Sequence, residues 1–149
     1  SRGLGDVYKR QKLGTVGAVA LDANGNLAAG TSTGGMTNKR YGRIGDVPVI
    51  GAGTYAENGV CGISATGHGE FFIRNVVAHD IAARIKYADH TIDKAATEVI
   101  TELKEKGGAG GVIGLDSQGY VVMPFNTPGM FRGYISLDGS PVVAIYAED

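Results

Sequence analysis

The chain has 149 residues, enough for one modest domain with a hydrophobic core. A formal net charge of −1 predicts no basic stripe for nucleic acid, and no apolar stretch is long enough to cross a bilayer. The single cysteine, Cys61, excludes an internal disulfide, and its uncharged neighbours indicate a small buried side chain. We therefore expect a cytoplasmic protein that binds neither nucleic acid nor a membrane.

The first eleven residues, SRGLGDVYKRQ, differ in composition and rhythm from the rest. Their second half, Asp6 to Gln11, can be reverse-translated as GAT GTG TAT AAG AGA CAG, which matches the transposase-adapter sequence used in preparing sequencing libraries. We interpret residues 1–11 as a translated, non-native adapter, so that they carry no information on the fold. The natural sequence is then expected to begin, truncated, at Lys12.

Strands are expected first along the chain. Residues 15–21 and 27–33 are apolar runs, and Asn24-Gly25 between them is a strong hairpin signal. A polar, glycine-rich loop follows over 34–46. A second pair of strands is predicted over 47–55 and 60–65.

Two helices are expected next. Apolar residues at helical spacing predict one helix over 70–87. Thr91 is the predicted N-cap of a second helix, which runs to about Lys106 and ends at the glycines of 107–111. Two further hairpins are predicted, the first from residues 112–115 and 120–125 and the second from residues 131–136 and 142–147. This order of elements predicts an α+β domain with a mostly antiparallel sheet.

Three short segments could carry chemistry. They are Gly14-Thr15-Val16-Gly17-Ala18-Val19, Thr31-Ser32-Thr33-Gly34-Gly35 and Ala65-Thr66-Gly67-His68-Gly69-Glu70. Each alone is weak, because threonine is common in strands and glycine-rich junctions between strands and helices recur for many reasons. Their joint presence, in this order and at this spacing, is the informative observation.

Together with Gly42-Arg43-Ile44-Gly45-Asp46 and Pro124-Phe125-Asn126-Thr127, these segments resemble the plant-type asparaginase/isoaspartyl peptidase family of N-terminal-nucleophile hydrolases. The resemblance implies a four-layer αββα sandwich, of which this chain would hold the catalytic half only. It also implies a precursor that cuts itself at a Gly-Thr bond, here Gly14–Thr15. Residues 12–14 would then end the upstream α-subunit, and residues 15–149 would be the catalytic β-subunit.

A newly exposed N-terminal threonine has a clear chemical advantage as a nucleophile. A threonine hydroxyl is weakly nucleophilic at neutral pH and needs a base beside it. The α-amine of an N-terminal threonine is such a base, with an ordinary pKa of about 7.7–8.0. While Thr15 is internal this amine does not exist, so cleavage would create the base and free the nucleophile together.

The resemblance also assigns roles to other residues. Thr33 would orient the Thr15 hydroxyl, and Thr66 with the backbone N–H of Gly67 would form the oxyanion hole. Arg43 would bind the α-carboxylate of the substrate and Asp46 its α-ammonium, while Gly67 and Gly69 would let the backbone approach the substrate. Without the flanking motifs, Arg43 and Asp46 would more simply form a surface ion pair.

The expected activity is hydrolysis of L-asparagine and β-aspartyl (isoaspartyl) dipeptides through a threonyl acyl-enzyme. A glycosylasparaginase-like hydrolase and a non-catalytic sandwich that never matures remain alternatives. Gly34 favours the asparaginase branch, because glycosylasparaginases tend to carry Asn at that position.

The expected partners follow from the same resemblance. They are a small-molecule or dipeptide substrate and the upstream α-subunit of the same precursor, assembled as a dimer of αβ protomers. No cofactor or metal is expected in this chain, and any structural sodium would be held by the upstream half. With residues 1–14 attached to Thr15 and that half missing, we expect this chain alone to be inactive.

Overall fold

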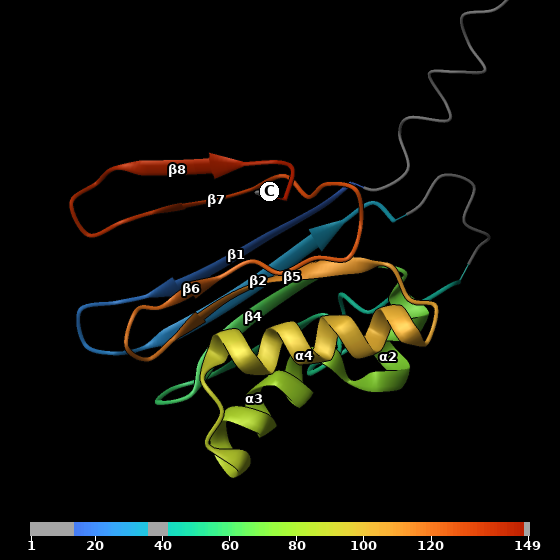
Figure 1. Cartoon of the computed structure of the whole chain (residues 1–149), viewed down its shortest axis with the longest axis horizontal. Coiled ribbons are helices and arrows are strands. Elements are labelled where there is room, and N and C mark those ends of the chain that lie inside the picture. Colours follow the sequence, from blue (N-terminus) through green and yellow to red (C-terminus); the bar gives the residue numbers. More distant parts are fainter. Residues whose placement is uncertain (1–13, 36–41, 148–149) are drawn as a thin grey trace, which may run out of the picture.

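The structure is a computed structural model that describes residues 14–35 and 42–147 (Figure 1). It contains both helices and strands, with the helices on one side of a central sheet and two hairpins on the other. This confirms the α+β prediction. The interpreted adapter, residues 1–11, lies outside the described residues.

The first hairpin matches the prediction. Strand β1 (Thr15–Leu21) pairs antiparallel with β2 (Leu27–Thr33), with Thr15 opposite Thr33. In the turn, Asp22 Oδ1 accepts hydrogen bonds of 2.8 Å from the N–H groups of Asn24 and Asn26. Gly25 has a φ of 82°, which glycine adopts without steric cost.

The central sheet has four antiparallel strands in the order β3 (Thr54–Glu57), β4 (Cys61–Gly67), β5 (Gly110–Asp116) and β6 (Val121–Val122). The hairpin β1–β2 packs face to face on β3, β4 and β5. The two layers approach closely at Gly17, where a Cβ atom would overlap the Ser64 hydroxyl. This contact brings the first half of β1 against the middle of β4.

The predicted strand over 47–55 is wrong for most of its length. The N–H groups of Val49 and Gly53 both donate to the carbonyl of Asp46, at 3.0 and 3.2 Å, and Gly51 has a φ of 87°. These turns are incompatible with an extended strand, so β3 begins only at Thr54. The partner predicted over 60–65 is confirmed as β4.

The single helix predicted over 70–87 is divided into α2 (Gly69–Asn75) and α3 (Val77–Ala88). Val76 separates them in a left-handed conformation, with φ 48° and ψ 46°, which is uncommon for a β-branched residue. The N–H of Ala78 donates to the carbonyl of Ala52 at 3.2 Å, outside the helix. Apolar spacing continues through this break, so the sequence pattern could not reveal it.

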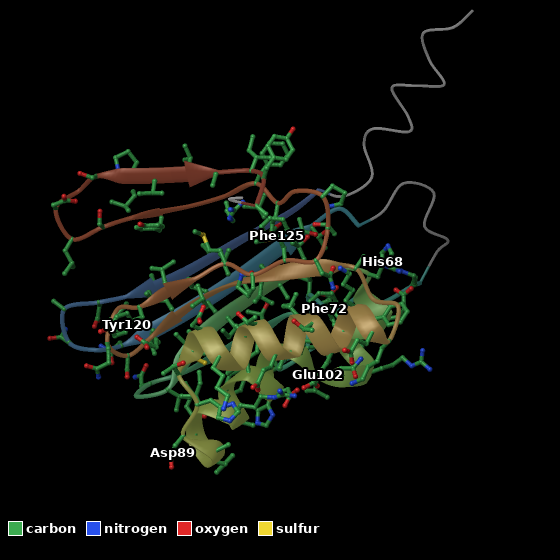
Figure 2. The ribbon with its side chains drawn as sticks, in the orientation of Figure 1. His68, Phe72, Asp89, Glu102, Tyr120 and Phe125 are labelled. Atoms are coloured by element: carbon green, nitrogen blue, oxygen red, sulfur yellow. The ribbon has the colours of Figure 1, made fainter. Side chains whose placement is uncertain are left out.

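Helix α4 (Ile92–Glu105) confirms the second predicted helix. Thr91 is its N-cap, and its side chain accepts a hydrogen bond from the N–H of Lys94 at 3.3 Å. The main core lies between α3, α4 and the central sheet, with Phe72 from α2 pointing into it (Figure 2). Cys61 is fully buried in this core, as expected. No helix in the described ranges is long and apolar enough to cross a membrane.

The last two predicted hairpins are also present. The turn between β5 and the short β6 is closed by Asp116 Oδ1, which accepts hydrogen bonds from the N–H groups of Gln118 and Tyr120. Strands β7 (Arg132–Ile135) and β8 (Pro141–Ala144) form a separate antiparallel pair. Their turn is closed in the same way by Asp138, which accepts from the N–H of Ser140 at 2.9 Å.

We predict that Thr91→Ala lowers the free energy of unfolding by about 1 kcal/mol, because the first turn of α4 loses its cap. Urea denaturation of the two forms of the protein measures this difference. Thr101→Ala is the matched control, since Thr101 is exposed within α4 and its hydroxyl donates only to the Thr97 carbonyl. A loss from Thr101→Ala as large as that from Thr91→Ala would contradict the capping role.

Candidate active site

The two predicted threonines of the first hairpin are in direct contact. Thr15 Oγ1 donates a hydrogen bond of 3.0 Å to Thr33 Oγ1. Thr33 Oγ1 also accepts a hydrogen bond of 2.9 Å from the N–H of Gly35. Thr15 and Thr33 are partners in the antiparallel register, so their side chains project from the same face of the hairpin. The structure therefore places Thr33 where it can orient the Thr15 hydroxyl.

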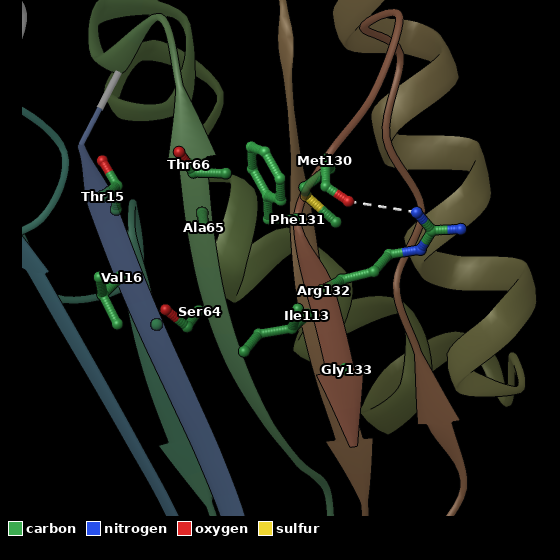
Figure 3. A pocket seen from close by; sticks show the side chains of 11 residues that line it. Thr15, Val16, Ser64, Ala65, Thr66, Ile113, Met130, Phe131, Arg132 and Gly133 are labelled. Carbon is green, nitrogen blue, oxygen red and sulfur yellow. Dashed lines mark hydrogen bonds between the residues drawn. The ribbon is translucent and has the colours of Figure 1, made fainter. Parts of the chain in front are cut away.

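Thr66 shares a pocket with Thr15 (Figure 3). The pocket has a volume of about 360 Å³, within the usual range for small-molecule sites. Strand β1 supplies Thr15, and Thr66 lies near the end of β4. The opposite wall comes from the segment around β7, a contribution that the sequence did not suggest: Met130, Phe131, Arg132 and Gly133.

The backbone at Gly67 lies in a tightly packed position beside Thr66. A Cβ atom on Gly67 would come within 2.6 Å of a ring carbon of Phe72 and 2.8 Å of the Gly110 Cα. Only glycine fits there without a shift of the surrounding atoms. Gly67 is the register partner of Gly110, at the pair where β4 ends and β5 begins.

Asn126 supports this end of the site, a role that its sequence motif did not indicate. Its Oδ1 accepts from the N–H of Gly110 at 2.8 Å, and its Nδ2 donates to the carbonyls of Ile100 and Gly108 at 3.2 and 3.1 Å. Asn126 therefore fixes the strand that pairs with Gly67. Its place within the Pro-Phe-Asn-Thr motif was the one signal in the sequence.

Asp46 is a buried carboxylate, with only 7% of its surface exposed. Cβ atoms on Gly53 and Gly69 would come within 2.8 and 2.7 Å of its side-chain oxygens. Asp46 Oδ2 accepts no hydrogen bond from any described residue. A buried acceptor without a donor is costly, so this oxygen lowers the stability of the fold.

The electrostatics of Asp46 agree with its burial. Desolvation raises the pKa of this carboxyl above its usual value, while backbone hydrogen bonds and the positive charge of Arg43 act in the opposite direction. Arg43 itself is exposed. Neither Arg43 nor Asp46 lines the pocket shared by Thr15 and Thr66. Gly67 and Gly69 do not line it either, and Gly69 instead packs against the Asp46 side chain.

The described parts of the chain hold no group of three or more His, Cys, Asp or Glu side chains placed to bind one metal ion.

The chain belongs to the asparaginase family, whose model matches residues 4–145. It is 52% identical over 141 residues to the isoaspartyl peptidase of Escherichia coli, covering 94% of this chain and 44% of the relative. It is 50% identical over 139 residues to the isoaspartyl peptidase of Salmonella typhimurium, covering 93% and 44%. Identity to the isoaspartyl peptidase/L-asparaginase of Rattus norvegicus is 45% over 118 residues, covering 78% and 35%.

These comparisons confirm the family resemblance predicted from the motifs. The chain spans less than half the length of the relatives it matches. The family match begins at residue 4, inside the segment interpreted as an adapter, so that interpretation stays a prediction.

We predict that Asp46→Asn raises the thermal stability of the protein at neutral pH. Because the pKa of Asp46 is higher in the folded state than its ordinary value of 3.8, the folded state holds more protons between the two values. The folded protein therefore loses stability as pH rises from the ordinary pKa to the raised pKa of Asp46. Above the raised pKa, the free-energy cost of the buried ionised carboxylate stays constant. The variant lacks this cost, so its advantage should appear at neutral pH and vanish below pH 3.8.

Melting temperatures of both forms, followed by circular dichroism across this pH range, measure the effect. Asp89→Asn is the control, because Asp89 is exposed and its left-handed conformation suits asparagine. If Asp46→Asn loses stability at neutral pH while Asp89→Asn does not, the fold itself must satisfy the ionised carboxylate.

Proposed function

We propose that this chain is the catalytic β-subunit of a threonine-nucleophile amidohydrolase that cleaves L-asparagine and β-aspartyl (isoaspartyl) dipeptides. The observation that carries this proposal is the hydrogen bond from Thr15 to Thr33 beside Thr66, directly after Gly14. Relatives about half identical in sequence are named isoaspartyl peptidases, which supports the choice of substrate.

Maturation begins with cleavage of the Gly14–Thr15 amide. The new α-amine of Thr15 is then free to accept the proton of its own hydroxyl as the oxygen attacks the side-chain carbonyl of the substrate. The Thr66 hydroxyl and the Gly67 N–H stabilise the oxyanion, and losing one such donor typically costs about 3–4 kcal/mol. The protonated α-amine then donates its proton to the leaving nitrogen, so that the C–N bond breaks, ammonia or a peptide amine departs and a threonyl ester remains. Water then hydrolyses the threonyl ester.

One recognition site suffices for both substrates. In asparagine and in a β-aspartyl dipeptide, the aspartyl unit keeps a free α-ammonium and a free α-carboxylate, and the bond that breaks is a side-chain amide. Asp46 is the carboxylate that binds the ammonium. Arg43 binds the carboxylate with its planar guanidinium.

The upstream half of the precursor completes the enzyme. Large apolar side chains around β7 and β8 are exposed, including Phe131 at 85%, Ile135 at 76% and Val143 at 83%. Such a patch is typical of a surface that another segment covers. The α-subunit adds the remaining layer of the αββα sandwich and holds any structural sodium, and the αβ protomers form a cytoplasmic dimer. With residues before Thr15 attached, this chain alone is inactive.

In the full-length precursor, Thr15→Ala should abolish both cleavage after Gly14 and turnover, because both need the hydroxyl. Thr15→Ser keeps the hydroxyl and amine and should retain reduced activity. Mass spectrometry detects a product beginning at Thr15, and ammonia release measures asparagine hydrolysis. Full activity in Thr15→Ala would refute the role of Thr15 as the nucleophile. Activity on glycosylated asparagine but not on isoaspartyl dipeptides would make the enzyme a glycosylasparaginase.

Arg43→Lys should raise KM for asparagine by about tenfold or more while changing kcat less, since an ammonium cannot make paired contacts with a carboxylate. Steady-state kinetics on asparagine measure both constants. Arg74→Lys is the matched control, because Arg74 is exposed in the last turn of α2. Equal KM values for Arg43→Lys and the wild-type enzyme would leave Arg43 with a structural role only.

A further inference from the structure

Three side-chain hydroxyls meet between the β1–β2 hairpin and the central sheet. Thr31 Oγ1 on β2 lies 2.5 Å from Thr54 Oγ1 on β3 and 2.6 Å from Ser64 Oγ on β4. It also donates to the carbonyl of Gly53 at 3.3 Å. We call Thr31, Thr54 and Ser64 the inter-sheet hydroxyl cluster.

The strand register explains why this cluster can form. Thr31 is paired with Gly17 across the hairpin, and Thr54 is paired with Ser64 across the central sheet. Because Gly17 has no side chain, Ser64 can extend past β1 and reach Thr31. Ser64 is only 2% exposed, so its hydroxyl must find partners inside the protein. An apolar side chain would fill the same space without these directional bonds.

Two residues of the cluster each lie two positions before a residue of the candidate active site on the same strand. Thr31 precedes Thr33 by two residues on β2, so both side chains project from the same face. Ser64 precedes Thr66 by two residues on β4 in the same way. Hydrogen bonds within the cluster therefore tie the strand that orients Thr15 to the strand that carries Thr66.

The cluster also connects to the backbone of Asp46. The Gly53 carbonyl, which accepts from Thr31, also accepts from the N–H of Ala65 at 2.8 Å. The N–H of Gly53 donates to the Asp46 carbonyl at 3.2 Å. A short path of hydrogen bonds thus runs from Thr31 to the residue proposed to bind the ammonium.

We propose that the inter-sheet hydroxyl cluster sets the position of the Thr15 hairpin relative to the substrate site at Asp46. Thr31 is then a positioning residue that controls the rate of acylation and leaves substrate affinity nearly unchanged. This inference rests on the function proposed above. A nucleophile must lie about 3–3.5 Å from the carbon it attacks, and a displacement of about 1 Å can cost about 100-fold in rate. Directional hydrogen bonds fix such a distance better than apolar contacts, which have no preferred direction.

The test uses Thr31→Val, which keeps the shape of the side chain and removes its hydroxyl, in the full-length precursor. Rates are divided by the amount of enzyme with a free Thr15 N-terminus, measured by mass spectrometry. We expect kcat for L-asparagine to fall by about 10- to 100-fold. KM should stay within about twofold, since Arg43 and Asp46 are retained. Thr31→Ser, which keeps the hydroxyl, should restore most of kcat.

Two further variants distinguish the loss of the cluster from a general effect of the substitution on folding. Thr54→Val removes one of the two hydroxyls that meet Thr31 and should lower kcat less than Thr31→Val does. Thr101→Val makes the same chemical change at an exposed position on α4 and should leave kcat unchanged. An unchanged kcat in Thr31→Val and Thr54→Val, or a raised KM with an unchanged kcat, would overturn the proposal.

Hydrogen exchange gives a readout that does not need activity. The amides of Gly53 and Ala65 should exchange faster in Thr31→Val than in the wild-type protein, while the amides of α4 stay unchanged. Equal protection of Gly53 and Ala65 in the two proteins would overturn the positioning role. If the wild-type enzyme hydrolyses neither asparagine nor isoaspartyl dipeptides, the proposed function fails, and this exchange comparison still decides whether the cluster couples the two sheets.

Discussion

The close approach of β1 to β4 at Gly17 determines where the proposed nucleophile lies. At this point one strand has no side chain, and the Ser64 hydroxyl occupies the space that a Cβ atom would fill. Thr15 lies two residues before Gly17, so its position relative to Thr66 follows from how closely the layers pack. Gly67 and Gly69 act in the same way at the other side of the site, where the chain passes close to Gly110 and Asp46. The site is therefore built where glycine lets backbone segments come together.

Local signals predicted the parts of the fold that depend on local contacts. Asn24-Gly25 marked the first hairpin and Thr91 marked the start of α4, and both are closed by hydrogen bonds within a few residues. The break at Val76 depends on a hydrogen bond from Ala78 to Ala52, which is distant in sequence. The turns around Asp46 likewise replaced an expected strand. Apolar spacing contains no information about such contacts.

In the candidate site, too, some residues were predicted from local motifs and others were revealed only by contacts distant in sequence. Thr15, Thr33 and Thr66 were predicted because their motifs resemble those of a known family, and the structure brings Thr15 next to Thr33 and into one pocket with Thr66. Asn126 was present in a recognised motif but had no assigned role. Thr31 and Ser64 were missed as partners, because a hydroxyl contact between two sheets depends on how closely those sheets pack. The burial of Asp46 was also invisible in the sequence, because it depends on the packing of Gly53 and Gly69 around the carboxylate.

Three of the hairpin turns, those of β1–β2, β5–β6 and β7–β8, have a consequence for the order of folding. Each is closed by an aspartate that accepts backbone N–H groups from residues two or four positions ahead: Asp22, Asp116 and Asp138. Such short loops close quickly and with little loss of chain entropy. The pairing of Gly67 with Gly110 instead joins residues that are separated in the chain by α2, α3 and α4. Thr15 and Thr33 can therefore meet early, whereas the backbone around Gly67 is completed late. A precursor that folds in this order has its attacking hydroxyl ready before the groups that stabilise the oxyanion, so the proposed self-cleavage would be delayed until the core has formed.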